Sequence, residues 1–155
     1  MAHDYKAICD RVYNAFNTGI VKDLDGVFAP GFVEHEEFPG VTATGAEVPK
    51  EAIRMFHQGF PDLHFEVLDV LGQGDRLCVW YRLTGTNSGP FMGMPATGRP
   101  IDVQGFDYVT LDERHRVTEH WGVSQDLKMM MQLGLIPEPA ATIDLNEAER
   151  SQLPH

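Results

Sequence analysis

Asp126 is a carboxyl group that could take part in proton transfer. It follows the last strand-like segment of the chain and directly precedes a short, Met-rich segment of helical pattern. Burial beside apolar side chains raises the pKa of a carboxyl group, and such a group can take a proton from carbon and later return one. Asp is also a preferred residue at a helix N-terminus, where it caps the backbone. The sequence therefore allows two roles for Asp126, acid/base group and helix cap.

His35 is the second candidate, and it stands in the run Glu34-His35-Glu36-Glu37. At the mouth of a pocket, an imidazole could hydrogen-bond an enolate oxygen or orient a carboxylate. The alternative is a solvated acidic loop that contains an incidental histidine. The spacing of this run does not put ligands on one face, so we expect no metal site there.

His120 precedes Trp121 in the last predicted strand. Successive side chains of a strand point to opposite faces of the sheet. If the apolar Val117 and Trp121 face the helices, His120 lies on the other face, at the sheet surface or in a subunit interface. We therefore expect His120 to lie outside the pocket, although a β-bulge after Gly122 could reverse this orientation.

Large apolar side chains are abundant, and most of them must form the core. The loop Phe91-Met92-Gly93-Met94 differs, because flexible methionines beside glycine suit an adaptable lid over a flat apolar ligand. The same loop could instead plug the mouth of the fold or contact a second subunit. The side chains predicted to line the ligand pocket are Phe38, Phe56, Phe60, Trp80, Phe91, Met92, Met94, Phe106 and Trp121.

The elements that must position these residues begin with helices. Apolar residues recur every three or four positions over 5–16, which predicts a helix that Asp4 caps and Gly19 ends. The other elements predicted for the first part of the chain are a short helical face over 24–28 closed by Pro30, a strand over 32–35 and a third helix over 49–59.

After residue 62 the apolar residues recur with a period of two, which indicates strands. Residues 72–75 and 112–115 are typical of hairpin turns, and residues 85–100 are typical of a long loop. Helices followed by antiparallel strands predict an α+β fold, with a strongly curved antiparallel sheet packed against three N-terminal helices. We expect a cavity between the helices and the face of the sheet that they cover. The later strands and the final short helix are predicted over 65–71, 77–84, 101–111, 116–124 and 127–133.

Composition limits the class of protein. The 155 residues carry a formal net charge of −11 and are 43% hydrophobic, which is typical of one globular domain. Lys and Arg form no cluster, which argues against nucleic acid or an anionic membrane as a partner. The N-terminus has no leader pattern, no segment is long enough to span a bilayer, and Cys9 and Cys78 are expected as free thiols. These features predict a cytoplasmic protein.

Three motifs, in this order, resemble the SnoaL-like polyketide cyclases, a family of the NTF2-like superfamily. Residues 85–98 are similar to the family's loop G-T-x-x-G-x-F-x-G-x-P-x-T-G, and Glu119-His120-Trp121 is followed by Asp126. Gln132-Leu133-Gly134 is similar to the end of the family's terminal helix. Each motif alone is weak, but their order and spacing over residues 4–136 make the match fairly specific.

The resemblance implies a cone-shaped domain over residues 1–136, followed by a C-terminal arm over 137–155. It implies an aldol-type ring closure without metal or organic cofactor, with Asp126 as the acid/base on an enolisable polyketide-like ester or ketone. Characterised members have a histidine in the strand where this chain reads Phe106-Asp107-Tyr108-Val109. Tyr108 is therefore the predicted donor to an oxyanion, and His35 is the predicted orienting group. The resemblance also implies a homodimer or higher homo-oligomer that uses the exposed sheet face.

Two other functions fit the same pocket. The superfamily's fold is shared by non-catalytic domains, so the chain could simply bind a hydrophobic small molecule. It could also be an isomerase or a dehydratase, because these reactions use the same type of acid/base group. In each case the expected partner is a hydrophobic small molecule.

Overall fold

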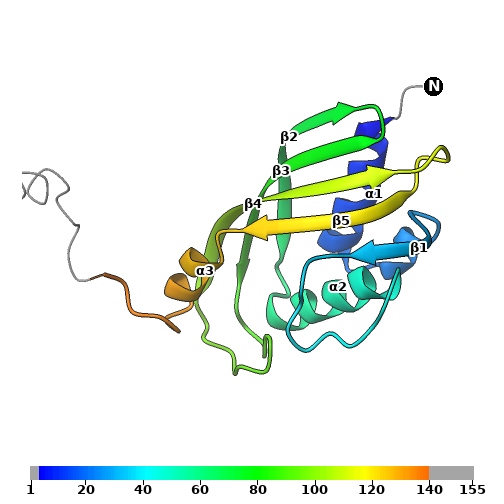
Figure 1. The fold of residues 1–155 in the computed structure, drawn as a ribbon. Helices are drawn as coiled ribbons and strands as arrows, with labels where there is room; N and C mark the ends of the chain where they lie inside the picture. The colour runs from blue at the N-terminus through cyan, green and yellow to red at the C-terminus, as the bar shows by residue number, and fades with distance from the viewer. Residues whose placement is uncertain (1–3, 140–155) are drawn as a thin grey trace, which may run out of the picture.

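The protein folds as a curved five-stranded sheet with two long helices on one face, and the computed structural model describes residues 4–139 (Figure 1). The helices are α1 (Tyr5–Thr18), the 3-10 helix η1 (Val21–Leu24), α2 (Glu47–Gly59) and α3 (Asp126–Gln132). The strands are β1 (Phe28–Glu34), β2 (His64–Gln73), β3 (Arg76–Thr86), β4 (Pro100–Leu111) and β5 (Val117–Ser124).

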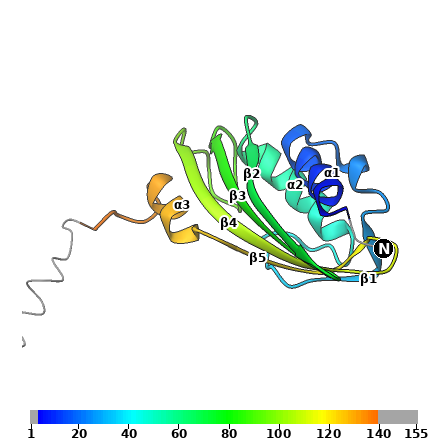
Figure 2. The ribbon, with the colours of Figure 1, turned by 90° about the horizontal axis from the view of Figure 1, so that it is seen from above.

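The strands are arranged in the order β1-β5-β4-β3-β2, with β1 parallel to β5 and all other neighbours antiparallel. Seen from above, the strands curve around α1 and α2, whereas α3 lies beside β4 at the far end of the sheet (Figure 2). This arrangement confirms the predicted α+β fold. The arm predicted for 137–155 lies outside the described residues from residue 140 onward. Among residues 4–139, no helix has the length and apolar character needed to cross a membrane.

α1 begins and ends where the sequence predicts. The Asp4 side chain accepts a hydrogen bond from the Ala7 backbone N–H at 3.0 Å, and Gly19 ends the helix with a φ of 74°. The apolar stripe of the helix packs against the sheet and buries Cys9 and Tyr13. α1 therefore turns Tyr13 toward the concave face. Cys9 and Cys78 are free thiols, as expected.

β1 is longer than predicted and replaces the second part of a predicted helix. η1 ends at Leu24, and the strand already begins at Phe28. Pro30 is tolerated because β1 is an edge strand that pairs with β5 alone among the described strands. The last residue of β1, Glu34, lies opposite His120 of β5.

A β-bulge near the start of β5 decides which of its side chains face the helices. Leu111 of β4 pairs with Val117, whereas the preceding residue, Thr110, pairs with Glu119. Thr118 is therefore an extra residue in β5. An extra residue shifts the in–out alternation of a strand by one position.

The bulge reverses the predicted orientation of the following residues. Val117 is buried, and His120, three residues later, lines a cavity on the same face. Trp121 is on the opposite, helix-free face and is 38% exposed. The prediction that Trp121 faces the helices and His120 faces away is therefore wrong.

The loop over residues 87–99 closes one end of the core, and the buried Asn87 holds it in place. Asn87 Nδ2 donates to the carbonyl oxygens of Gly59 and Gly89, and its Oδ1 accepts from the backbone N–H and the hydroxyl of Thr97. Phe91 of this loop is 2% exposed and belongs to the core. This part of the loop therefore acts as a plug.

Candidate active site

A cavity of about 340 Å³ lies between the concave face of the sheet and the helices. Its size suits a small molecule. Most of its wall is apolar and comes from α1, α2, β2, β3 and β4. Lys and Arg are absent from the lining contributed by residues 4–139. The polar and ionisable residues of the wall are Tyr13, Glu34, Glu36, Glu37, Tyr81, Asp107, His120, Ser124 and Asp126.

His120 is held between two carboxylates in this wall. Its Nδ1 lies 2.6 Å from Glu34 Oε1, and its Nε2 lies 3.1 Å from Asp107 Oδ1. Burial alone would lower the pKa of His120, but the hydrogen bonds to Asp107 and Glu34 outweigh burial and raise it to about 10. The Tyr13 hydroxyl donates to the second oxygen of Asp107. One imidazolium and two carboxylates thus satisfy one another within the protein.

Glu36 differs from these carboxylates because its carboxyl group makes no hydrogen bond to residues 4–139. The group lies above Gly122, where a Cβ would come within 2.1 Å of Glu36 Oε2. Burial and the nearby Asp107 carboxylate raise the pKa of Glu36 to about 7, although His120 opposes the shift. Glu36 can therefore either donate or accept a proton near neutral pH.

Asp126 is the first residue of α3 and lines the cavity while remaining exposed. The cap position belongs to Gln125, so Asp126 does not take the predicted capping role. The Ser124 hydroxyl donates to Asp126 Oδ1. Asp126 Oδ2 has no hydrogen-bond partner among the described residues, which leaves one carboxylate oxygen available to a ligand.

Glu34, Glu36 and His120 each bring one possible metal-ligand atom within 4.8 Å of the others. The run 34–37 alone could not reveal this group, because its third member comes from β5. In the structure, His120 Nδ1 already shares a proton with Glu34, and metal binding would have to displace that proton. Metal binding by His120 Nδ1 and its hydrogen bond to Glu34 therefore exclude each other.

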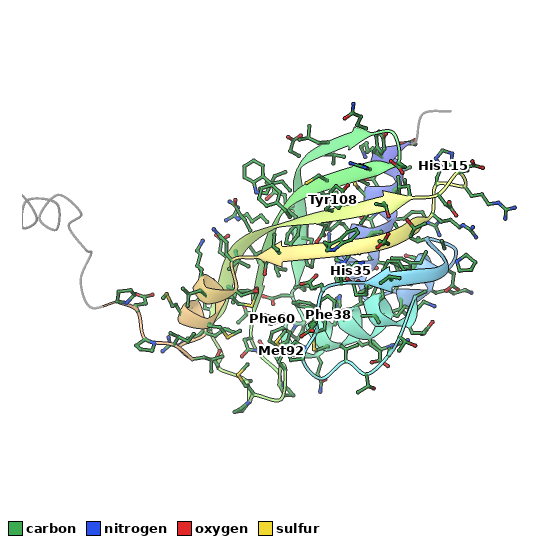
Figure 3. The ribbon with its side chains drawn as sticks, viewed as in Figure 1. His35, Phe38, Phe60, Met92, Tyr108 and His115 are labelled. Atoms are coloured by element: carbon green, nitrogen blue, oxygen red, sulfur yellow. The ribbon has the colours of Figure 1, made fainter. Side chains whose placement is uncertain are left out.

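The cavity wall includes some of the apolar residues predicted from the sequence and leaves out others. Phe38, Phe56, Phe91 and Met92 line the cavity. Phe60 is fully buried in the core cluster against which Phe38 and Met92 pack; all three are labelled in Figure 3. The predicted side chains that do not line the cavity are Phe60, Met94, Trp80, Phe106 and Trp121.

Trp80 and Phe106 lie on the helix-free outer face of the sheet. Their rings stack 5.9 Å apart, and they are 37% and 48% exposed. In β3, the neighbouring residues Val79 and Tyr81 are buried and line the cavity, so alternation turns Trp80 outward.

His35 and Tyr108 also lie away from the cavity; Figure 3 shows His35 near the end of β1 and Tyr108 on β4. The His35 ring stacks on Trp121 at 4.3 Å, and its Nε2 lies 2.8 Å from Glu119 Oε2. Tyr108 is paired with Trp121 across β4 and β5. The alternation that brings Asp107 into the cavity turns Tyr108 outward. The structure therefore does not bring His35 or Tyr108 to Asp126.

Sequence reasoning missed most of the polar residues of the cavity. A usable signal existed in β4, where Asp107 shares its parity with the apolar Val103 and Val109. A carboxylate that points to the same face of a strand as apolar residues indicates a buried, functional or paired charge. Tyr81 likewise shares its parity with the apolar Val79 and Leu83 of β3. His120 had no such signal, because the bulge that turns it inward depends on pairing with β4.

Comparison with known proteins agrees with this architecture. The sequence matches the family model of the SnoaL-like polyketide cyclases over residues 7–133. No curated protein sequence matches the chain at a significant level.

Solved structures share the fold. TsrD from Streptomyces laurentii is 25% identical, with a TM-score of 0.79 over 88% of this chain and 99% of TsrD. IdmH from Streptomyces antibioticus, described as a candidate polyketide cyclase, is 29% identical, with a TM-score of 0.72 over 85% of this chain and 99% of IdmH. AclR from Streptomyces galilaeus, described as a candidate hydroxylase, is 24% identical, with a TM-score of 0.75 over 96% of this chain and 90% of AclR. The likeness to AclR supports the fold alone.

Proposed function

The chain belongs to the SnoaL-like polyketide cyclase family, and from this premise we propose that it is an acid/base enzyme that needs no cofactor and acts on an enolisable, polyketide-like ketone or ester. Asp126 is the proposed acid/base group. The observation that supports the proposal is that Asp126 Oδ2 lies at the wall of a largely apolar cavity and has no hydrogen-bond partner among the described residues. Glu34 and Asp107, by contrast, are already paired with His120.

The proposed reaction is an aldol-type ring closure. Asp126 takes a proton from the carbon next to a carbonyl group, and the C–H electron pair moves into the carbonyl to form an enolate. The enolate carbon attacks a second carbonyl carbon of the same molecule, which forms a C–C bond and leaves an alkoxide. The protonated Asp126 then returns its proton to the alkoxide oxygen, so the enzyme ends in its starting state.

The cavity supports this chemistry in two ways. Its apolar wall excludes water from an enolate, which water would protonate before the ring closed. It also holds a flexible chain in a folded conformation, so that the two reacting carbons remain near each other. The residues suited to this holding role are Phe38, Phe56, Phe91 and Met92, together with the apolar face of α1.

Solvent deuterium uptake into a panel of β-keto esters tests the role of Asp126. We expect Asp126→Asn to lower the enzyme-dependent exchange rate by about 100-fold, because the amide cannot accept the proton. Asp75→Asn, in the exposed turn between β2 and β3, is the matched control and should exchange like the parent. Equal exchange in Asp126→Asn and the parent would remove Asp126 from the mechanism.

A non-catalytic binding protein is the second candidate. The observation that favours it is the closed group of His120, Glu34 and Asp107, whose side chains hydrogen-bond to one another instead of to a substrate. Tight binding of an apolar ligand without exchange or conversion would support this function. Product analysis separates cyclisation from isomerisation and dehydration, because only dehydration changes the mass and only cyclisation forms a ring.

A further inference from the structure

Tyr81 has a hydroxyl group at the cavity that no described residue uses. The residue is 7% exposed, lines the cavity, and packs its ring against Tyr13 and Phe65. Its hydroxyl makes no hydrogen bond within residues 4–139. Among the described residues, no buried side-chain nitrogen or oxygen atom lacks a hydrogen-bond partner, so the Tyr81 hydroxyl is open to the cavity. This hydroxyl is therefore suited to a partner that arrives with a ligand.

Gly105 provides the space that this hydroxyl occupies. Tyr81 lies directly opposite Gly105 in the pairing of β3 with β4. A Cβ at residue 105 would lie 2.3 Å from the Tyr81 hydroxyl and 2.8 Å from the Val123 carbonyl oxygen. Glycine at this position thus lets the ring extend over β4.

The charges around the hydroxyl define the kind of ligand atom that fits. Burial raises the pKa of Tyr81 well above its usual value, and Asp107, Glu36 and Asp126 raise it further, so the phenol keeps its proton. The described part of the wall offers no Lys or Arg to balance an anionic ligand group. A neutral carbonyl oxygen accepts a hydrogen bond without adding negative charge.

We propose that Tyr81 is the hydrogen-bond donor that binds the carbonyl oxygen of a neutral ketone or ester in this cavity. The inference rests on the cavity being the ligand site, as in the proposed function, but it does not require Asp126 to be the base. During proton abstraction, the same hydrogen bond would strengthen as negative charge develops on the oxygen. Tyr81 thus takes the donor role that the family resemblance predicts for Tyr108.

The test compares two ligands of nearly equal shape, acetonaphthone and ethylnaphthalene, by isothermal titration calorimetry. We expect Tyr81→Phe to weaken binding of the ketone by about threefold to tenfold and to leave binding of the hydrocarbon unchanged. Naphthoate should bind the parent more weakly than the ketone. The matched control is Tyr108→Phe, on the outer face, which should bind all three ligands like the parent.

A second readout follows the carbonyl directly. With isotope-labelled acetonaphthone, the carbonyl carbon resonance of the bound ketone should lie further downfield in the parent and in Tyr108→Phe than in Tyr81→Phe. Gly105→Ala, whose Cβ would displace the hydroxyl, should reproduce the loss of ketone affinity.

Three results would overturn the inference. The first is equal ketone affinity in the parent and Tyr81→Phe, and the second is a parent that does not prefer the ketone to the hydrocarbon. The third is a clear loss of thermal stability in ligand-free Tyr81→Phe, which would reveal a structural partner for the hydroxyl. None of these results depends on deuterium exchange. Failure of the Asp126→Asn test would contradict the proposed function alone.

Discussion

Two histidines, each hydrogen-bonded to a glutamate, lie on opposite faces of the sheet where β1 meets β5. His120 and Glu34 are on the inner face, with side chains that are 16% and 7% exposed. His35 and Glu119 are on the outer face, with side chains that are 35% and 43% exposed. The hydrogen-bond distances are similar, 2.6 Å and 2.8 Å. The two pairs therefore differ in burial much more than in contact geometry.

Strand geometry produces both pairs at once. Glu34 is in register with His120, and Val33 is in register with Glu119. The next residue after Glu34, His35, points to the opposite face and reaches Glu119 there. Identical residue types thus acquire different properties from the side of the sheet that they face. On the inner face of the sheet, water cannot screen the charges, so the stability of each charged side chain depends on its hydrogen-bonded partner.

The largest predicted effect comes from removing the inner histidine. His120→Asn leaves Glu34 and Asp107 as buried carboxylates without a cation, and we expect a loss of about 3 kcal/mol in the free energy of unfolding. The matched outer variant, His35→Asn, removes a screened pair and should cost less than about 1 kcal/mol. Urea unfolding at neutral pH measures both values. Equal losses would show that burial does not separate the two pairs.

A second substitution tests whether uncompensated charge causes the loss of stability in His120→Asn. Adding Glu34→Gln to His120→Asn removes one of the two uncompensated carboxylates, so part of the lost stability should return. If the double variant is less stable than His120→Asn, packing and not charge explains the loss.

The next effect concerns Glu36, a half-buried cavity carboxyl that makes no hydrogen bond to residues 4–139. Its pKa rises from an ordinary value of 4.5 to about 7, so the stability gained from its neutral form is complete below pH 4.5 and is lost as the pH rises through 7. Glu36→Gln stays neutral and avoids this loss. We expect the variant to gain roughly 2 kcal/mol on the parent between pH 5 and pH 8.

Thermal unfolding at intervals across this pH range checks the Glu36 prediction. The control is Glu113→Gln, an exposed carboxyl in the turn between β4 and β5, which should follow the parent at every pH. His120, whose pKa is raised to about 10, adds a further loss of stability between pH 6.5 and 10 in all of these proteins. Parallel curves for the parent and Glu36→Gln would contradict the prediction.

Much of this fold could be predicted from local patterns in the sequence. The helical spacing in α1, its cap at Asp4 and its end at Gly19 depend on neighbouring residues alone, and so do the hairpin turns. These signals are local, and the structure agrees with them. The early start of β1 was harder to predict, because Pro30 normally argues against a strand and only an edge position tolerates it.

The candidate site was less predictable, because one residue, Thr118, decides which side chains of β5 face the cavity. Thr118 is recognisable as a bulge only from the pairing of β5 with β4, and sequence spacing contains no such information. Without the bulge, strict alternation puts Trp121 inside and His120 outside. Helix and loop positions are free of this problem, and Phe38, Phe56 and Met92, which occupy such positions, line the cavity. Trp80 and Phe106 were misplaced because size and apolarity do not reveal the face of a strand.

The outer face gives the prediction with the smallest expected effect on unfolding. Trp80, Phe106 and Val123 lie in one row across β3, β4 and β5, and all three are exposed. The family resemblance predicts that a second copy of the chain covers this face. An aspartate at residue 106 would place a charge at the centre of such an interface, where desolvation is costly. Because Phe106 is 48% exposed, Phe106→Asp should lower the stability of one subunit by about 1 kcal/mol or less.

Analytical ultracentrifugation at micromolar concentration tests this use of the outer face. We expect the parent to sediment as a dimer or higher oligomer and Phe106→Asp to sediment as a monomer that still binds acetonaphthone in its cavity. Ile20→Asp puts the same charge on an exposed apolar residue that lies between α1 and η1, away from the sheet, and should sediment like the parent. A monomeric parent would show that no second copy covers this face. A Phe106→Asp monomer that has lost ketone binding would instead show that the two faces are coupled, because the only change lies on the side of the sheet that the ligand does not touch.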